Sequence, residues 1–354
     1  MQVIIKKLLV VFFVFFSSLA FANGTNEEET KQEEEFNAVE EIMNHISNTN
    51  EWHLFTLTDE HGHENHISIP LPIIIYDGEF KFFMSSKVAH GHKHEGYTLV
   101  HSRLTSLEGK KKAGFLDLFM GMENTFIDFS ISKNVLALLI SVVIIFFLFR
   151  AMARSYSKNE LRPRGMTSLL EPIVLFVRDD IAIPNIGKNK VDKFLPYLLT
   201  VFFFIWINNL LGLVPIFPGG ANVTGNIGTT AVLAIITFVI VNLNGNKNYW
   251  QHIFKTPGVP VWMLLIMVPI EIIGVFTKPF ALMMRLFANI TAGHIMILSL
   301  ISLIFIFKTA LVGFASVPIA LFVSILELLV AALQAYIFTV LSALFIGLAV
   351  ADHH

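Results

Sequence analysis

The sequence predicts an all-α polytopic membrane protein, with about five membrane-crossing helices and one amphipathic helix at the membrane interface. A small β-containing region outside the cytoplasm is expected before them. Of the 354 residues, 54% are hydrophobic and 15% are charged, and the mean hydropathy is +0.66, which is too apolar for a soluble globular protein. Long segments carry no charge, and Lys and Arg gather in the connections between them.

The composition and motifs also argue against several functions. The net charge is −2, so nothing suggests a nucleic-acid partner. The chain has no cysteine, which rules out disulfides, thiolate metal sites and cysteine nucleophiles. It has no Gly-rich phosphate loop ending in Lys-Ser or Lys-Thr, so we do not expect it to be an enzyme on its own. The motifs G-x-S-x-G and H-E-x-x-H are absent, which argues against an intramembrane hydrolase.

Residues 1–22 predict a secretory signal peptide. Lys6 and Lys7 precede an apolar run from Leu8 to Phe16, and a small-residue cleavage site ends at Ala22. An uncleaved membrane anchor is the alternative. In either case the next segment starts outside the cytoplasm, and we expect a bacterial inner membrane.

Residues 23–115 predict an extracytoplasmic region. It begins with a Glu-dense segment, Asn23 to Glu41, that is typical of an acidic linker. Asp77-Gly78 predicts a hairpin turn between two of the β-like runs that follow. These runs are Trp52–Thr58, His66–Ile75, Glu79–Ser85 and Tyr97–His101.

Histidines are frequent in the same region: His61, His63, His66, His90, His92 and His94. Neutral imidazoles can bind zinc or copper. However, the spacing matches no specific ligand pattern, and solvated loops are the more common outcome. We therefore expect neither a metal nor another cofactor.

Residues 116–354 predict the membrane domain. Asn134–Phe149 is uncharged and ends at Arg150, so it predicts one span. The segment Phe194–Leu243 also lacks charge but is too long for one span, and Pro215–Asn222 divides it into two. Two further apolar segments follow, Pro260–Phe307 and Thr309–Ala351.

The loop charges orient these spans. Residues 150–193 are rich in Lys and Arg, residues 216–226 have neither, and residues 244–259 carry Lys247 and Lys255. By the positive-inside rule, the N-terminus lies outside and the C-terminus in the cytoplasm. Within the first of these connections, residues 167–183 predict an amphipathic helix on the cytoplasmic surface. Its apolar residues are Leu169, Leu170, Ile173, Val174, Val177 and Ile181, with Glu171 and Arg178 on the other face.

The last two apolar segments predict a long antiparallel hairpin. One helix over residues 264–307 would be about 66 Å long, roughly twice the hydrocarbon thickness of a bilayer. It must therefore be broken or strongly tilted. Residues Lys308–Gly313 are the expected tip, because they lie between two long apolar runs.

Polar residues on this hairpin predict proton handling. Arg285 at membrane depth costs about 2.5–3.5 kcal/mol on insertion scales, so it is rare without a function. Facing residues of an antiparallel hairpin have a constant index sum, which places Arg285 level with Gln334 and His294 level with Glu327. His294 and Glu327 can titrate, whereas Arg285 keeps its proton. Such a set suits a proton path that ends at a barrier. The alternative is a structural network, and Asn289 or Gln334 can serve as simple helix-helix contacts.

Small residues on the last helix allow a close helix neighbour: Ala331, Ala332, Ala335, Ala343 and Gly347. This neighbour is either a moving partner or another part of the same chain.

Two segments carry a resemblance to a known family. Lys278–His294 and Leu326–Phe338 together resemble subunit a of the F-type ATP synthase membrane sector. Asn208–Pro215 is similar to that family's second span, and Asp352–His354 to its short polar tail. The resemblance covers about residues 115–354.

The resemblance implies a proton-translocating stator subunit with two half-channels. It makes Arg285 the arginine that interacts with the c-ring carboxylate, with Asn289 and Gln334 as its polar neighbours. His294 and Glu327 match the half-channel pair. The implied partners are the c-subunit ring, the b-subunit peripheral stalk, the remaining ATP synthase subunits and the lipid bilayer.

The sequence also departs from the family pattern. Many bacterial relatives carry Glu at position 294 and His at position 327, whereas here the two are exchanged. The family's outer-side aspartate is replaced by Gly212. The signal peptide and the outer region are additions that the resemblance does not explain. A proton-coupled secondary transporter is the alternative function, although such proteins normally show repeated halves, and none is visible here.

Overall fold

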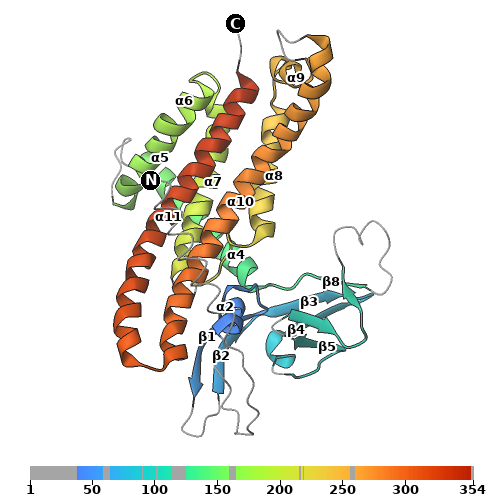
Figure 1. The fold of residues 1–354 in the computed structure, drawn as a ribbon, viewed down its shortest axis with the longest axis vertical. Coiled ribbons are helices and arrows are strands. Elements are labelled where there is room, and N and C mark those ends of the chain that lie inside the picture. The colour runs from blue at the N-terminus through green and yellow to red at the C-terminus, as the bar shows by residue number, and fades with distance from the viewer. Residues whose placement is uncertain are drawn as a thin grey trace, which may run out of the picture. The chain divides into compact units, whose positions relative to one another are not determined.

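The computed structural model describes residues 38–58, 64–89, 91–100, 103–113, 125–158, 165–214, 217, 219–255 and 260–351 (Figure 1). The expected signal peptide lies outside the described residues, as do most of the acidic linker and the residues His61, His63 and His90. Residues from Ala38 onward form one compact unit.

The predicted β-containing region is present between residues 38 and 128. Three small sheets have the strand orders β1-β2, β4-β3-β8-β7 and β5-β6. The elements are α2 (Ala38–Ile46), β1 (Glu51–Thr58), β2 (Glu64–Pro70), β3 (Pro72–Tyr76), β4 (Phe80–Met84), the 3-10 turn η1 (Ser85–Lys87), β5 (Tyr97–Val100), β6 (Arg103–Ser106), β7 (Lys111–Lys112) and β8 (Thr125–Asp128).

The run expected over His66–Ile75 is two strands, β2 and β3, that separate at Leu71. Pro70 and Pro72 flank this residue, and proline has no N–H to continue a strand ladder. The expected turn at Asp77-Gly78 is present, because Tyr76 pairs with Phe80 across it and Gly78 has a φ of 78°. Strand β8 pairs with β3, so the β-structure continues past residue 115.

Asp77, in the β3–β4 turn, accepts hydrogen bonds from two side chains. Lys110 Nζ donates to Asp77 Oδ2 at 2.7 Å, and Tyr97 Oη donates to the same oxygen at 3.0 Å. The Lys110 ammonium, with help from Tyr97, holds the pKa of Asp77 below its usual value, although burial opposes this. Burial, followed by Asp77, raises the pKa of Tyr97 to about 12. The stability that Asp77 contributes is therefore present at neutral pH and is lost as the pH falls through its lowered pKa.

The rest of the chain is helical. Four described helices are long and apolar enough to cross a membrane, or up to five if the pair α8 and α9, bent by 101°, counts as one span. The helices are α4 (Lys133–Lys158), α5 (Met166–Phe176), the π-helical segment η2 (Val177–Ala182), α6 (Ile183–Ile186), α7 (Val191–Leu213), α8 (Ile227–Leu243), α9 (Lys247–Phe254), α10 (Val261–Phe307) and α11 (Ala310–Val350). The protein is a polytopic membrane protein.

The predicted hairpin is formed by α10 and α11, which lie side by side (Figure 1). Helix α10 is continuous over 47 residues in spite of Pro269 and Pro279, so the expected alternative of a broken helix is wrong. It ends at Lys308, whose left-handed φ of 46° reverses the chain before α11 begins. The tip therefore lies where the sequence placed it.

Helix α7 forms the centre of the helical core. It contacts α11 on one side and α4 on the other, and Leu198, Phe203 and Ile205 are fully buried there. The region expected to hold an amphipathic helix is helical from Met166 to Ile186, with Val177 and Ile181 buried and Arg178 exposed. Leu169, expected on the apolar face, is 65% exposed instead.

Candidate functional site

The α10–α11 hairpin brings Glu327 against Gly293. A Cβ atom built on Gly293 would overlap Oε1 of Glu327 and would lie 2.8 Å from its Cδ. Nearer the tip, the side chain of Ile304 on α10 lies 3.8 Å from the point where Gly313 on α11 would carry a Cβ. This contact fits almost the same helix register as the contact between Gly293 and Glu327. Glu327 therefore meets α10 one residue before His294, as expected for two antiparallel helices joined at residue 308.

His294 is half-buried and reaches toward α7. Its Nε2 lies 3.5 Å from the point where Gly212 would carry a Cβ, and the carbonyl oxygen of Ala221 lies 3.4 Å from the same point. A side chain at position 212 would occupy space beside the imidazole. The glycine at position 212 thus leaves room for the imidazole of His294.

Glu327 is 5% exposed, and no described group donates a hydrogen bond to either of its carboxylate oxygens. Buried polar atoms are normally satisfied by protein or water, so an exception calls for a functional explanation. A carboxyl group that exchanges protons with a water-lined path is one such explanation.

Neutral polar side chains join the helices that carry this pair to α7 and to the loop between α7 and α8. Asn209 Nδ2 donates to the carbonyl oxygen of Ala331 at 3.2 Å, and Thr224 Oγ1 donates to Asn209 Oδ1 at 2.6 Å. Thr291 Oγ1 donates to the carbonyl oxygen of Gly225 at 3.4 Å. The sequence interpretation missed these residues and Gly293. The signal that could have found Asn209 is its position in an uncharged membrane segment, where polar groups need partners.

The structure divides the five predicted site residues into two groups. Arg285 and Asn289, one helical turn apart on α10, are exposed. Gln334 is 2% exposed and is buried, like Glu327. The exposure of His294 is intermediate. No described acidic side chain forms an ion pair with Arg285. The fixed cation is therefore free to meet another chain at this face.

A cavity of about 410 Å³ lies near the C-terminal ends of α9 and α11. Glu271 and Lys278, seven residues apart on α10, both line it. A smaller cavity of about 20 Å³, enough for roughly one water molecule, shares Tyr249 and Lys278 with it and extends to Leu282.

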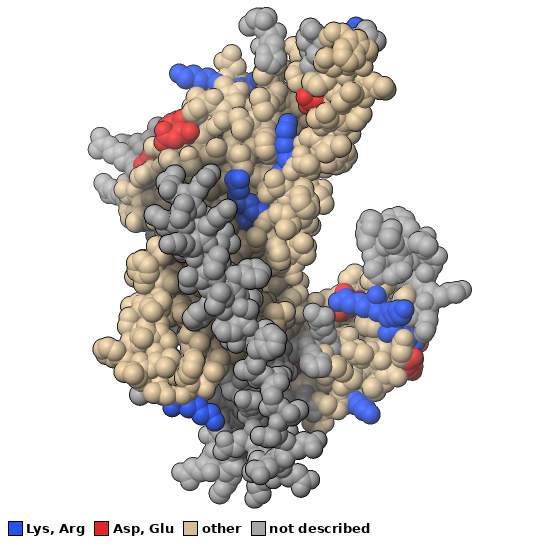
Figure 2. Space-filling view, in the orientation of Figure 1, with Lys and Arg blue, Asp and Glu red and all other residues tan. Residues whose placement is uncertain are grey.

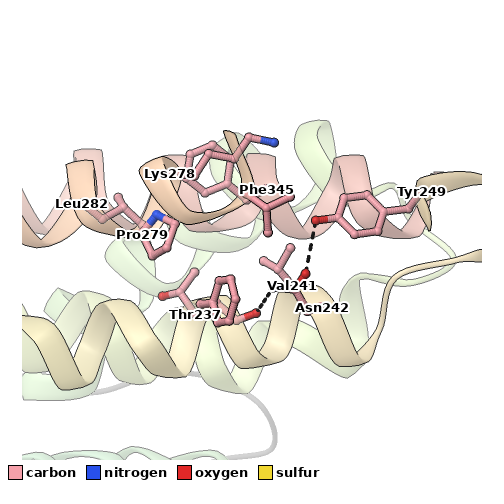
Figure 3. Close-up of a pocket in the computed structure, with 10 residues that line it drawn as sticks. Thr237, Val241, Asn242, Tyr249, Lys278, Pro279, Leu282 and Phe345 are labelled. Carbon is pink, nitrogen blue, oxygen red and sulfur yellow. Dashed lines mark hydrogen bonds between the residues drawn. The ribbon is translucent and has the colours of Figure 1, made fainter. Parts of the chain in front are cut away.

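Figure 3 shows this smaller cavity, in which Tyr249 Oη donates to Asn242 Oδ1 at 3.4 Å. Lys278 also lines it, and its Nζ lies 5.7 Å from the centre of the Phe345 ring. Leu282 is three residues before Arg285, or about 4.5 Å along the helix axis. The two cavities thus approach Arg285 from one side. The sequence interpretation did not assign Glu271 or Lys278 to the site. Glu271, Lys278 and Arg285 follow one another at intervals of seven residues, which places them on nearly one face of a helix and could have indicated a shared site.

The fold and the site together define a polytopic membrane protein with ionisable side chains between its helices and an exposed arginine that has no ion-pair partner among the described residues. Residues 135–347 match the family model for the ATP synthase A chain, and the chain belongs to this family. The recognition made from the motifs is therefore confirmed. The family is the membrane-sector proton-channel subunit of the F-type ATP synthase, and it is not catalytic on its own.

Three relatives illustrate the similarity. The chain is 48% identical to ATP synthase subunit a of Chloroherpeton thalassium over 235 residues, which cover 64% of this chain and 69% of the relative. It is 50% identical to ATP synthase subunit a 2 of Chlorobaculum tepidum over 237 residues, 64% of this chain and 66% of the relative. For ATP synthase subunit a of Myxococcus xanthus the identity is 46% over 241 residues, 66% of this chain and 77% of the relative.

The β-containing region matches a second family. Residues 41–129 fit the model of a domain of unknown function (DUF8433). This match includes the strands β1 to β8 and stops just before α4.

Proposed function

We propose that the chain is the proton-translocating stator subunit of a rotary F-type ATP synthase, with Arg285 facing the carboxylate of the c-subunit ring. The observation that carries this proposal is the division of the site. A titratable pair, His294 and Glu327, lies between helices, whereas Arg285 is exposed on α10 without an ion-pair partner among the described residues. A fixed cation in this position attracts an acidic group on a neighbouring chain and blocks a direct leak of protons.

Protons reach the ring from outside past His294 and Glu327, with Asn209, Thr224 and Thr291 as further polar groups along this half-channel. They leave through the cavity lined by Glu271 and Lys278, which approaches Arg285 from the other side. Asn289 lies beside Arg285 on the exposed face of α10. Gln334 lies at the same depth as Arg285 but is buried inside the hairpin. The membrane potential drives this movement with about 2.3 kcal/mol per charge for each 100 mV.

The remaining assignments belong to the same proposal. The partners are the c-subunit ring, the b-subunit peripheral stalk and the other ATP synthase subunits, in a bacterial inner membrane. The chain crosses about five times, with its N-terminus outside, and the helix from Met166 to Ile186 lies at the cytoplasmic interface. Residues 1–22 are a signal peptide, the outer region runs from residue 23 to the end of β8, and the membrane domain begins at α4.

The test is Arg285→Ala in the assembled complex, reconstituted in liposomes. We expect proton-driven ATP synthesis to be abolished, because the ring carboxylate loses its counter-charge and protons can leak between the half-channels. Arg154→Ala is the matched control, since this arginine is exposed near the end of α4 and away from the hairpin. Normal coupled synthesis in the Arg285→Ala complex contradicts the assigned role.

A further inference from the structure

Trp52 is the aromatic contact between the extracytoplasmic domain and the loop that follows α7. Trp52 of strand β1 is 2% exposed, and its ring meets that of Phe217 edge-on with the centroids 5.1 Å apart. Trp52 belongs to a small apolar cluster with Ala137 of α4 and with Ala221 and Val223. The last two residues lie in Gly219–Asn226, which we call the outer loop.

The chain next to Trp52 also caps the start of α4. The backbone N–H of Lys133 donates to the carbonyl oxygen of Thr49 at 2.9 Å, and that of Asn134 donates to Asn48 Oδ1 at 3.1 Å. The first N–H groups of a helix have no partner within the helix, so these two bonds satisfy groups that would otherwise be unpaired. Helix α2 contacts α10 as well. The segment before β2 is therefore joined to the membrane helices at several points.

The opposite side of the outer loop contacts the proposed half-channel. The Ala221 carbonyl lies beside the space between Gly212 and the His294 imidazole. Thr224 donates to Asn209, and the Gly225 carbonyl accepts from Thr291. Inside the loop, the Gly225 N–H donates to Asn222 Oδ1 at 2.9 Å, and the Asn222 side chain fills the space where a Cβ of Gly225 would be. The loop is thus a compact turn with the Trp52 cluster on one side and the proposed half-channel on the other.

We propose that Trp52 is a positioning residue for the outer half-channel, holding the outer loop so that its polar groups stay against His294 and Asn209. The inference rests on the proposed function, and it gives the domain at residues 41–129 a role in proton uptake. Trp52 supplies a large apolar surface with little conformational entropy to lose. The loop has no helical hydrogen bonds of its own across Ala221–Val223, so without this anchor it opens more often.

The first test measures loop opening and does not depend on proton transport. Because the chain lacks cysteine, Thr224→Cys provides a single thiol at a position that is 1% exposed. The assembled complex in nanodiscs is treated with a charged maleimide, with and without Trp52→Ala. We expect Trp52→Ala to accelerate labelling by at least about tenfold. An unchanged labelling rate overturns the proposal.

Two control variants separate the anchor from general damage to the domain. Trp52→Phe keeps an aromatic ring in the cluster, so labelling should stay close to the rate of the unaltered Trp52 background. Leu104→Ala truncates a buried side chain in a different apolar cluster of the same domain, which does not include the outer loop. It should leave the rate unchanged. If Leu104→Ala accelerates labelling as much as Trp52→Ala, loss of domain stability explains the effect and the proposal is wrong.

The second test asks whether the loop serves proton uptake. In liposomes without the added cysteine, Trp52→Ala should slow proton-driven ATP synthesis several-fold at equal complex content, and Trp52→Phe should restore it. If Trp52→Ala accelerates labelling but leaves the rate of ATP synthesis unchanged, the proposal is wrong, because the position of the loop would then have no effect on proton transport. The Arg285→Ala experiment is independent, since failure of the stator role would leave the labelling result intact.

Discussion

Gly293 determines where the carboxylate of Glu327 can lie. Any side chain at this position meets Glu327, whose Cδ is 2.8 Å from the site of a Cβ. The sequence pointed to His294 and Glu327 because charged or titratable groups are rare at membrane depth. It did not point to the glycine, because the need for space at position 293 arises from a residue on another helix.

The residue-scale prediction is Gly293→Ala. The added methyl displaces the Glu327 side chain, which is flexible enough to move, so the chain should still fold while proton-driven ATP synthesis falls by at least about tenfold. Gly313→Ala is the matched control, because its nearest neighbour is an Ile304 carbon at 3.8 Å, an ordinary contact. Adding Glu327→Asp to Gly293→Ala shortens the acid and should recover part of the activity. An active Gly293→Ala complex would contradict the assigned position of Glu327.

At the scale of elements, the face of α11 that carries the small residues packs against other helices of the same chain. Ala331, Ala335 and Ala343 are fully buried, and the Asn185 carbonyl of α6 lies so close to Gly347 that any Cβ there would overlap it. Of the two explanations for the small residues, intramolecular packing against α6 and α7 is therefore the one that applies to these four positions. The face that remains for a partner includes the exposed part of α10 around Arg285.

We predict that Gly347→Ala destabilises the protein by about 1–3 kcal/mol, because the backbone of α6 must move away from α11. The measurement is thermal unfolding of the purified full-length chain in detergent. Gly274→Ala is the control, since no atom lies within 4 Å of its Cβ position. Better helix propensity should make that variant more stable by about 0.5–1 kcal/mol. Equal stability of the two variants would show that α6 does not pack on Gly347.

At the scale of the whole molecule, most of the surface is apolar, and the charged side chains lie in small groups. Large hydrophobic side chains on α10 and α11 remain exposed, among them Leu265 at 82% and Phe314 at 82%, as expected for surfaces that meet lipid or other membrane subunits. Figure 2 shows Lys and Arg in small groups separated by wide areas without charge. This pattern is the one expected of a surface that is largely embedded in a membrane.

The corresponding prediction concerns topology. In intact cells, an impermeant thiol reagent should label Lys93→Cys, because this exposed residue belongs to the β-containing region that we propose lies outside the cytoplasm. Lys255→Cys, exposed at the end of α9, should react only after the membrane is permeabilised. Both variants rely on the absence of native cysteine. The reverse labelling pattern would invert the orientation and exchange the two half-channels.

Much of the fold was predictable from local patterns. The apolar segments, the break near Pro215 and the hairpin tip at Lys308 all follow from features that act within a few residues of the chain. The outer domain was predicted less completely: β6, β7 and β8 were missed, and β2 and β3 were joined. Short strands owe their stability to partners such as β3 for β8, so their own sequences carry little signal.

The candidate site shows the same limit on what local sequence patterns predict. Amino-acid order was enough to identify the family, to select Arg285, His294 and Glu327, and to align the last two helices, because uncompensated polar groups in lipid are rare and antiparallel pairing has a simple register. The folded chain was needed to show that Glu327 rests on Gly293, that Arg285 faces outward and that Trp52 reaches the outer loop. These contacts join segments far apart in the chain, and they depend on how side chains of different elements fill shared space.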